Sequence, residues 1–386
     1  MKKIKEILIL LAVIFLFTAC GGRNADNLIG PSEIDDSGQE ASTKTETESN
    51  SETYHYNTSI SSPIPNKKSP VALQMKPEEA IEKHLQALTK NGPRKWGTEN
   101  ELLAANYIKQ RMEEYGYSVQ IQVFPAYEFD IMADNDVNYF NLNPYNSKVI
   151  GEGHNVIAEL PTQQNTDKYL ILCAHYDTVS KELGIIDNTS GVLTLLELAR
   201  QISESNLPFN LRFIFFSSEE RFLMGSRYYV SNLSENDLDK IIACINVDMV
   251  GYAKGQELVV ATPYFANDPH DPLAGIGNAL TDEWQRIFPQ MNTPVKYSAS
   301  SDHVSFEKKR IPNMMITQKY FDYETVIKKD SDFENLSVDE LVNTVNLLKE
   351  YIVKLNIENI SYQGIALFYT KKNISHTSFA RVRRVN

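Results

Sequence analysis

The chain has 386 residues, of which 42% are hydrophobic and 23% charged, so it carries enough apolar side chains for a sizeable core. Its net charge of −12 at pH 7 argues against nucleic acid as a partner, because binding to phosphates needs a basic surface. Three cysteines are too few for a disulfide framework.

The N-terminus resembles a bacterial lipoprotein signal. Lys2, Lys3 and Lys5 precede an apolar stretch over residues 7–17, and two glycines follow Cys20. We therefore expect lipidation at Cys20 and an outward-facing position at the cell membrane. An uncleaved anchor helix is the alternative, although about 11 apolar residues are too few to span roughly 30 Å of hydrocarbon.

Composition divides the chain into four parts. The signal covers residues 1–20, and residues 21–72 are polar, with too few apolar side chains to fold, so we expect a flexible tether. One large domain should cover residues 73–357. Residues 358–386 form a locally basic extension, which we expect to be a frayed end, with contact to an anionic membrane surface as the alternative.

Two helices open the predicted domain. Pro77 begins a helix that should end at Thr89. Thr98 and Glu101 have the spacing of a capping box for a second helix, which Gly116 ends.

Strands come next in the chain. Residues 119–123 alternate between apolar and polar, and three short apolar runs at 169–174, 211–216 and 241–247 have the composition of strands buried on both faces of a parallel sheet. A helix capped by Ser337 closes the domain. We predict an α/β fold with a mostly parallel central sheet and helices on both faces, in three layers.

Polar side chains follow each of the three apolar runs. His175 and Asp177 come after the first, Glu219 and Glu220 after the second, and Asp248 after the third. Because ligands collect at the carboxyl ends of parallel strands, these side chains should meet at one rim. Imidazole and carboxylate groups together favour zinc, with manganese or cobalt as alternatives. Taken singly, each residue also fits a structural role, such as an acidic helix start at the glutamate pair.

A further carboxylate lies between the first two runs. Asp187 stands in the segment Gly184-Ile-Ile-Asp-Asn-Thr-Ser-Gly191, at the predicted start of a helix. It can bridge two cations there, since each of its oxygens can bind a different metal.

At this point the chain resembles the M28 family of zinc aminopeptidases, over roughly residues 77–356. The resemblance is carried by His175-Tyr-Asp177, Asp187-Asn-Thr-Ser-Gly191, Glu219-Glu220 with Gly225-Ser226 behind them, and Asp248. It implies the phosphorylase/hydrolase-like fold of zinc exopeptidases and hydrolysis of the N-terminal bond of peptides.

The resemblance also implies a role for each residue. His175, Asp187 and Asp248 would hold one metal, and Asp187 and Glu220 would hold the other. Glu219 would be the general base toward a metal-activated water, and Asp177 would orient the ligand imidazole.

One family ligand is missing. Ile327 stands where well-studied members have their last histidine. His303, in the segment Ser301-Asp-His-Val-Ser-Phe306, is the candidate replacement, and the alternatives are Asp330, Asp332 and Tyr323. The family implies two zinc ions, and this departure leaves one as the alternative.

Two other functions stay open. Glutaminyl cyclases share the fold with one zinc and transfer an acyl group within the substrate, although the retained Asp187-Asn-Thr-Ser-Gly191 favours the peptidase. A binding lipoprotein on a decayed peptidase scaffold is the non-enzymatic alternative, although such a protein has no reason to keep Glu219 beside Glu220.

Three smaller features complete the predictions. Phe222 replaces a glycine common in relatives, which should narrow the wall of the site. Cys173 and Cys244 lie in predicted core strands and should be free thiols, with a disulfide as the alternative. The segments at 127–146 and 262–271 are expected to shape the substrate pocket.

Overall fold

The computed structural model describes residues 74–128, 139–143, 146–179, 181–255, 257–261, 279–291, 301–319, 326 and 330–360. All of them belong to the second of two compact units, which begins at Ile60. Several predictions fall outside the described residues: the signal with Cys20, the tether, most of the two pocket-shaping segments, Tyr323 and Ile327, and the C-terminal extension beyond residue 360.

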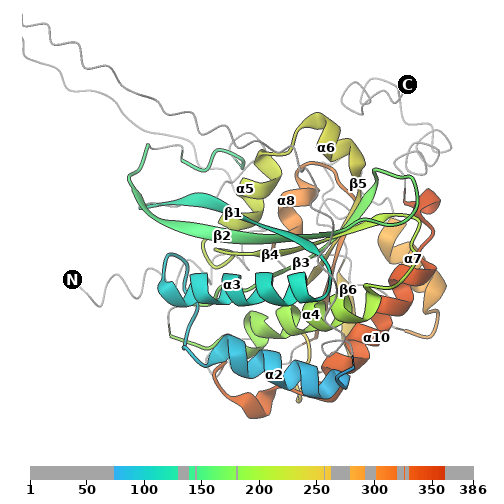
Figure 1. Ribbon diagram of the computed structural model, residues 1–386, viewed down its shortest axis with the longest axis horizontal. Helices are drawn as coiled ribbons and strands as arrows, with labels where there is room; N and C mark the ends of the chain where they lie inside the picture. Colours follow the sequence, from blue (N-terminus) through green and yellow to red (C-terminus); the bar gives the residue numbers. More distant parts are fainter. Residues whose placement is uncertain are drawn as a thin grey trace, which may run out of the picture. The chain divides into compact units, whose positions relative to one another are not determined.

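A seven-stranded sheet, in the order β1-β2-β4-β3-β5-β7-β6, forms the centre of the described domain (Figure 1). The strands are β1 (Ser118–Tyr127), β2 (Val149–Leu160), β3 (Tyr169–His175), β4 (Asn210–Phe216), β5 (Ile241–Val247), β6 (Leu258–Ala261) and β7 (Asn313–Gln318). β4, β3, β5 and β7 are parallel to one another, whereas β1, β2 and β6 pair antiparallel at the two sides. The predicted α/β fold with a mostly parallel sheet is confirmed, and the antiparallel outer strands are an addition to it.

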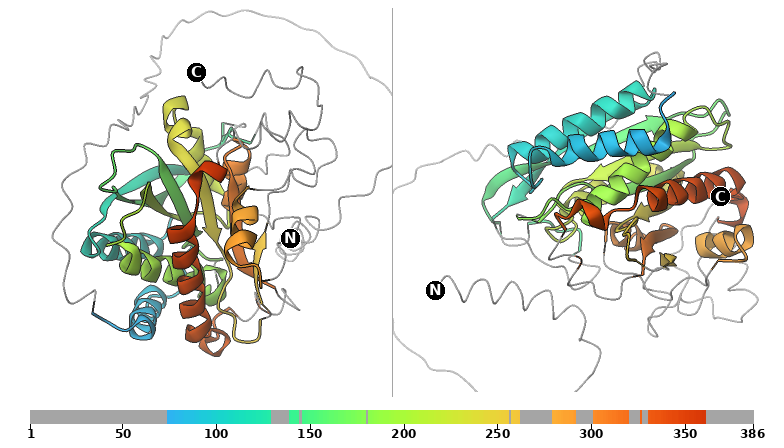
Figure 2. Two further views of the ribbon diagram at one scale, coloured as in Figure 1. Left: turned by 90° about the vertical axis from the view of Figure 1, so that its right-hand side faces the viewer. Right: turned by 90° about the horizontal axis from the view of Figure 1, so that it is seen from below.

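Helices cover both faces of the sheet. They are α2 (Pro77–Thr89), α3 (Glu99–Glu114), α4 (Ser190–Ile202), α5 (Met224–Ser231), α6 (Glu235–Lys240), α7 (Ala279–Ile287), α8 (His303–Glu307) and α10 (Val338–Lys354), with short helical turns η1 (Ile185–Thr189), η3 (Phe333–Asn335) and η4 (Ile357–Asn359). α2, α3, α4 and α10 lie side by side on one face, and α5, α6 and α8 lie on the other (Figures 1 and 2). This is the predicted three-layer arrangement.

The strand β3 shows why the sheet is buried on both sides. Its residues alternate between two apolar clusters, with Leu170 and Leu172 packing toward α2, α3, α4 and α10, and Ile171 and Cys173 packing toward α5, α6 and α8. All seven residues of the strand are buried. A continuous apolar run therefore serves two cores at once.

The predicted helix starts are present, with one difference. The hydroxyls of Thr98 and Ser337 accept hydrogen bonds from the backbone amides of Glu101 and Glu340, as N-caps do. Glu101, however, does not return a bond to the cap. Its buried carboxylate instead accepts from Tyr176 and pairs with His154, so the predicted capping box is only half formed.

Among the described residues, no helix is both long enough and apolar enough to cross a membrane.

Candidate metal centre

Predicted site residues lie at the ends of three parallel strands. His175 is the last residue of β3, Asp248 follows the last residue of β5, and Glu219 and Glu220 follow β4 after a tight turn. The turn is made by Ser218, whose φ of 60° is uncommon for a residue other than glycine. The strand ends therefore bring these side chains to one rim, as the order of the sheet requires.

Asp187 reaches the same rim from η1, the short turn that leads into α4. Its φ and ψ of −107° and 90° are not helical, and the Asp187–Asn188 peptide bond is cis. The side chain of Asn188 holds the turn against β5, because its Nδ2 donates to Val247 O at 2.9 Å and its Oδ1 accepts from Met249 N at 3.2 Å. The Asp-Asn-Thr-Ser-Gly motif thus connects the start of α4 to the segment that carries Asp248.

The side chains from these elements converge on the imidazole of His175. Its Nε2 lies 3.1 Å from Asp187 Oδ1 and 3.6 Å from Asp248 Oδ1. One potential ligand atom from each of His175, Glu219 and Asp248 lies within 4.8 Å of the other two. An imidazole with carboxylate oxygens on the side of Nε2 is a suitable donor set for a divalent cation.

Asp177 supports this cluster from behind. Its carboxylate accepts hydrogen bonds from the backbone amides of Glu219 and Glu220, at 3.0 and 3.3 Å, and Oδ1 lies 3.5 Å from His175 Nδ1. Asp177 therefore fixes the turn after β4 and faces the ring nitrogen of His175 that points away from Asp187. The hydrogen-bond partner of His175 Nδ1 is the backbone oxygen of Asp177, at 3.2 Å, so the predicted orienting role of the Asp177 carboxylate stays a prediction.

The carboxylate of Asp248 is held on one side only. Ser301 Oγ donates to Asp248 Oδ2 at 2.6 Å, and Asn246 Nδ2 donates to that same hydroxyl at 2.8 Å. Asp248 Oδ1 is buried and has no hydrogen-bond partner among the described residues. A buried carboxylate oxygen without a partner is costly, so its position toward His175 Nε2 fits a site built for a cation.

The pKa values in the cluster are shifted by burial and by the close approach of several carboxyl groups to the single imidazole of His175. Burial raises the pKa of Asp187, Glu219 and Glu220 above ordinary values. Burial lowers the pKa of His175, but the surrounding carboxylates raise it by more, so that its pKa lies well above 6.5. Burial also raises the pKa of Asp248, but the attraction of the nearby His175 imidazole and the hydrogen bond from Ser301 lower it overall. A cation would relieve this repulsion by neutralising the carboxylates directly.

Three predicted ligands lie outside the group of three: Asp187, which lies 3.1 Å from His175 Nε2, Glu220 and His303. Glu220 is partly exposed, and after burial the charge of Asp187 contributes most to the rise in its pKa. His303 is fully buried in α8, neither ring nitrogen has a hydrogen-bond partner among the described residues, and burial lowers its pKa to about 4. The structure therefore places Glu219, but neither Glu220 nor His303, in the group of three with His175 and Asp248.

The other candidate replacements for the missing histidine differ in their surroundings. Asp332 is exposed. Asp330 is buried, and its two carboxylate oxygens accept the backbone amides of Ile186 and Asp187. Burial raises the pKa of Asp330 to about 7, although these two hydrogen bonds lower it.

Several residues have supporting roles at the site that were not predicted from the sequence. Arg94, Asn188 and Ser301 each hold a site segment by hydrogen bonds that join residues 53 to 95 positions apart. Asn188 and Ser301 stand beside predicted residues, so their motifs marked the region but not their roles. Arg94 lies in a polar loop with no periodic pattern, and nothing in the sequence pointed to it.

Two further sequence features can be located near the site. Cys173 and Cys244 are buried free thiols with their sulfur atoms 3.5 Å apart, as predicted. Phe222 is 42% exposed just after the glutamate pair, with a φ of 58°. The narrowing of the site wall by Phe222 stays a prediction.

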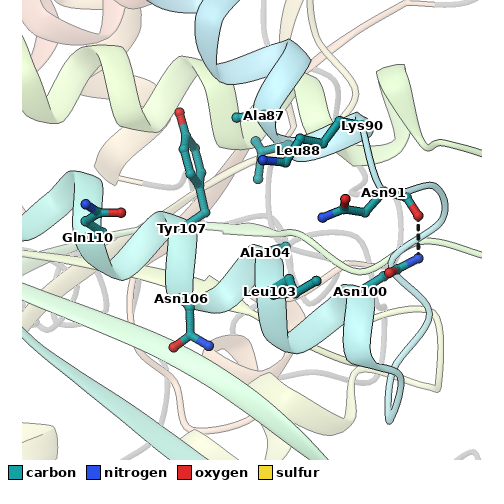
Figure 3. Close-up of a pocket in the computed structure, with 10 residues that line it drawn as sticks. All are labelled: Ala87, Leu88, Lys90, Asn91, Asn100, Leu103, Ala104, Asn106, Tyr107 and Gln110. Carbon is teal, nitrogen blue, oxygen red and sulfur yellow. Dashed lines mark hydrogen bonds between the residues drawn. The ribbon is translucent and has the colours of Figure 1, made fainter.

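A cavity of about 240 Å³ lies elsewhere, between α2 and α3 (Figure 3). Asn91, Asn100, Leu103 and Tyr107 are among the residues that line it, and Asn100 donates a hydrogen bond to Asn91 O across its edge. None of the residues of the metal cluster lines this cavity, so it is separate from the chemistry described above.

Residues 155–352 match the family described as peptidase family M28. Aminopeptidase YwaD of Bacillus subtilis (strain 168) is 34% identical over 140 residues, which cover 35% of this chain and 29% of that protein. The matched segments make up 29 to 44% of the lengths of the first curated relatives, so the chain spans less than half of each.

Two solved structures have a similar fold. An aminopeptidase from Aneurinibacillus sp. strain AM-1 has a TM-score of 0.57 and 22% identity, covering 71% of this chain and 93% of that one. A glutaminyl cyclase from Porphyromonas gingivalis has a TM-score of 0.55 and 20% identity, covering 71% of this chain and 97% of that one. At such identities the likeness establishes the fold, which both classes of enzyme share.

Proposed function

The chain belongs to peptidase family M28, and from this premise we propose that it is a metal-dependent aminopeptidase that hydrolyses the N-terminal peptide bond of peptides. The observation that carries the proposal is the meeting of Asp187 Oδ1 and Asp248 Oδ1 at Nε2 of His175, with Glu219 close by. The aminopeptidase assignment is supported by the names of relatives such as YwaD.

The ligands follow from the geometry and the family pattern. His175, Asp187 and Asp248 would hold one zinc ion, and Asp187 with Glu220 would hold a second one, for which a further ligand is not assigned. A bound zinc ion polarises the scissile carbonyl and makes a water molecule more acidic. Asp177 would hold the turn of the glutamate pair in place beside the imidazole of His175.

Glu219 is the residue that we propose as general base. It lies within the close group around His175, and burial raises its pKa above the ordinary value of 4.5. A carboxylate with a raised pKa is suited to accept a proton near neutral pH and to release it again. Glu219 would therefore take the proton of the attacking water and deliver it to the leaving amine.

The location is also part of the proposal. A lipid on Cys20 would anchor the enzyme on the outer side of the cell membrane, and the polar segment 21–72 would give the domain reach. Peptides outside the cell membrane would then be its substrates, and the acidic charge of the chain disfavours nucleic acid as a partner.

One experiment separates the alternatives. The full chain is purified in detergent, its metal content is counted by elemental analysis, and turnover is measured on leucine p-nitroanilide and on a peptide with N-terminal glutamine. Bound zinc with leucine anilide hydrolysis supports the proposal. Bound zinc with cyclisation of glutamine alone would identify a glutaminyl cyclase, and neither metal nor turnover would leave the binding lipoprotein.

A further inference from the structure

Two buried side chains of opposite charge hold the loop that carries Asp187. Asp330 lies just before η3 and is 3% exposed, and Arg94 lies between α2 and α3 and is 1% exposed. They come from parts of the chain more than 200 residues apart, and neither belongs to the group of three around His175. Both are in contact with residues 183–189.

Asp330 satisfies the amides at the start of the loop. Its Oδ1 accepts from Ile186 N at 2.6 Å, its Oδ2 accepts from Asp187 N at 2.9 Å, and its backbone oxygen accepts from Ile185 N at 3.0 Å. The first amides of a helical turn have no partner within the turn, so without Asp330 these buried groups would be unpaired. One residue therefore fixes three successive amides, including that of Asp187 itself.

Arg94 forms hydrogen bonds with both ends of the same loop. Its Nη1 donates to Leu183 O at 2.9 Å and its Nη2 donates to the hydroxyl of Thr189 at 2.7 Å. Its Nε donates to Tyr176 O at 2.7 Å, one residue after His175. A planar guanidinium with fixed donor directions ties these segments together at set distances.

The contacts of Arg94 and Asp330 determine how the predicted ligands His175 and Asp187 are placed relative to each other. The loop on either side of Asp187 and the chain beside His175 are joined by one guanidinium, and the amide of Asp187 is joined to Asp330. Asp187 has non-helical dihedral angles, so no regular helix bond keeps it in place. Displacements of about 1 Å matter at such centres, because a ligand that moves by that much no longer fits the coordination sphere.

We propose that Asp330 and Arg94 are positioning residues that hold the carboxylate of Asp187 where the cation binds. The inference rests on the metal site of the proposed function. It also assigns Asp330 a task other than replacing the missing histidine, because both of its oxygens are engaged with the loop.

The test measures cation binding and does not depend on turnover. The full chain in detergent is freed of metal with a chelator, and Zn²⁺ affinity and stoichiometry are measured by competition with a chromophoric chelator. The variants are Asp330→Asn, which cannot accept both amides, and Arg94→Met. Matched controls are Glu334→Gln, an exposed acid of the same segment, and Lys95→Met, the exposed neighbour of Arg94.

The expected result is a loss of about 10- to 100-fold in Zn²⁺ affinity for both test variants, with the number of ions per chain unchanged and both controls like wild type. The visible absorption of the Co²⁺ form should change in the test variants, which a loss of global stability alone does not produce. If either test variant fails to fold, Thr189→Val removes one contact of Arg94 and should weaken binding by several-fold.

Two results would overturn the inference alone. Wild-type affinity in the test variants would show that the loop holds Asp187 without them, and fewer ions per chain in Asp330→Asn would show that Asp330 is a ligand. Wild-type protein that binds no cation at all would instead overturn the proposed function together with this inference.

Discussion

Replacing Ser301 by alanine should weaken cation binding and the metal-free fold together. The hydroxyl donates to Asp248 Oδ2 at 2.6 Å and accepts from Asn246 at 2.8 Å, in a fully buried position. Alanine leaves one carboxylate oxygen and one amide N–H without these partners. At about 1–3 kcal/mol for each buried polar group, the free energy of unfolding should fall by about 2–6 kcal/mol.

The effect on the site is separable from the effect on stability. Without the hydroxyl, the Asp248 carboxylate can rotate and its Oδ1 is no longer kept toward His175, so Zn²⁺ affinity should fall by about 10- to 100-fold. Urea denaturation of the metal-free protein measures the loss of stability, and competition with a chromophoric chelator measures the loss of Zn²⁺ affinity.

A neighbouring serine gives the control. Ser305 is equally buried and hydrogen-bonds to the hydroxyls of Tyr139 and Ser226, away from any ligand carboxylate. Ser305→Ala should lower stability while leaving Zn²⁺ affinity unchanged. Unchanged affinity in Ser301→Ala, or an equal loss in both variants, would refute the role given to Ser301.

Three other outcomes follow from the described contacts. Glu219→Gln should lower peptidase turnover by about 10²- to 10⁴-fold with metal content unchanged. The exposed control Glu334→Gln should have full activity. Full activity of Glu219→Gln would refute the role of Glu219 as general base. Burial lowers the pKa of His154, but the Glu101 carboxylate raises it by more, so that the pKa lies above 6.5 overall. The ion pair therefore contributes its full stabilisation below about pH 6.5, and this contribution is lost as the pH rises through the raised pKa of His154. Denaturation of Glu101→Gln should therefore show a larger stability loss at about pH 6 than at about pH 9, and equal losses would contradict this. Gly191→Ala should destabilise the protein by about 1–3 kcal/mol, because a β-carbon there would lie 2.4 Å from a backbone oxygen of β5; an unchanged melting temperature would count against it.

The sequence predicted the parts of the fold that have strong local signals. Continuous apolar runs identified β3, β4 and β5 because strands buried on both faces need apolar side chains at every position. The caps at Thr98 and Ser337 were recognisable because they depend on residues three positions apart. The ends of those strands then placed His175 and Asp248 at one rim.

Other features depended on contacts that no local pattern encodes. Glu101 looked like a capping residue, yet its carboxylate pairs with His154, 53 positions away. Asp330 looked like a candidate ligand, yet it binds amides 143 and 144 positions earlier in the chain. Such pairings are decided by how the layers pack, so the sequence alone could not reveal them.

The turn at the glutamate pair is a further case. Ser218, Phe222 and Leu223 all have positive φ, although none is a glycine or asparagine that would announce such a conformation. Because these turns set the directions of the two adjacent side chains, adjacency in the sequence did not show that Glu219, and not Glu220, lies in the close group with His175 and Asp248.

The most direct test of the metal site is anomalous diffraction at the zinc absorption edge from crystals of the protein grown with Zn²⁺. We expect a peak at coordination distance from His175 Nε2 and from carboxylate oxygens of Asp187 and Asp248. A peak bound by other residues, or no peak on these three side chains at saturating zinc, would contradict the proposed metal centre.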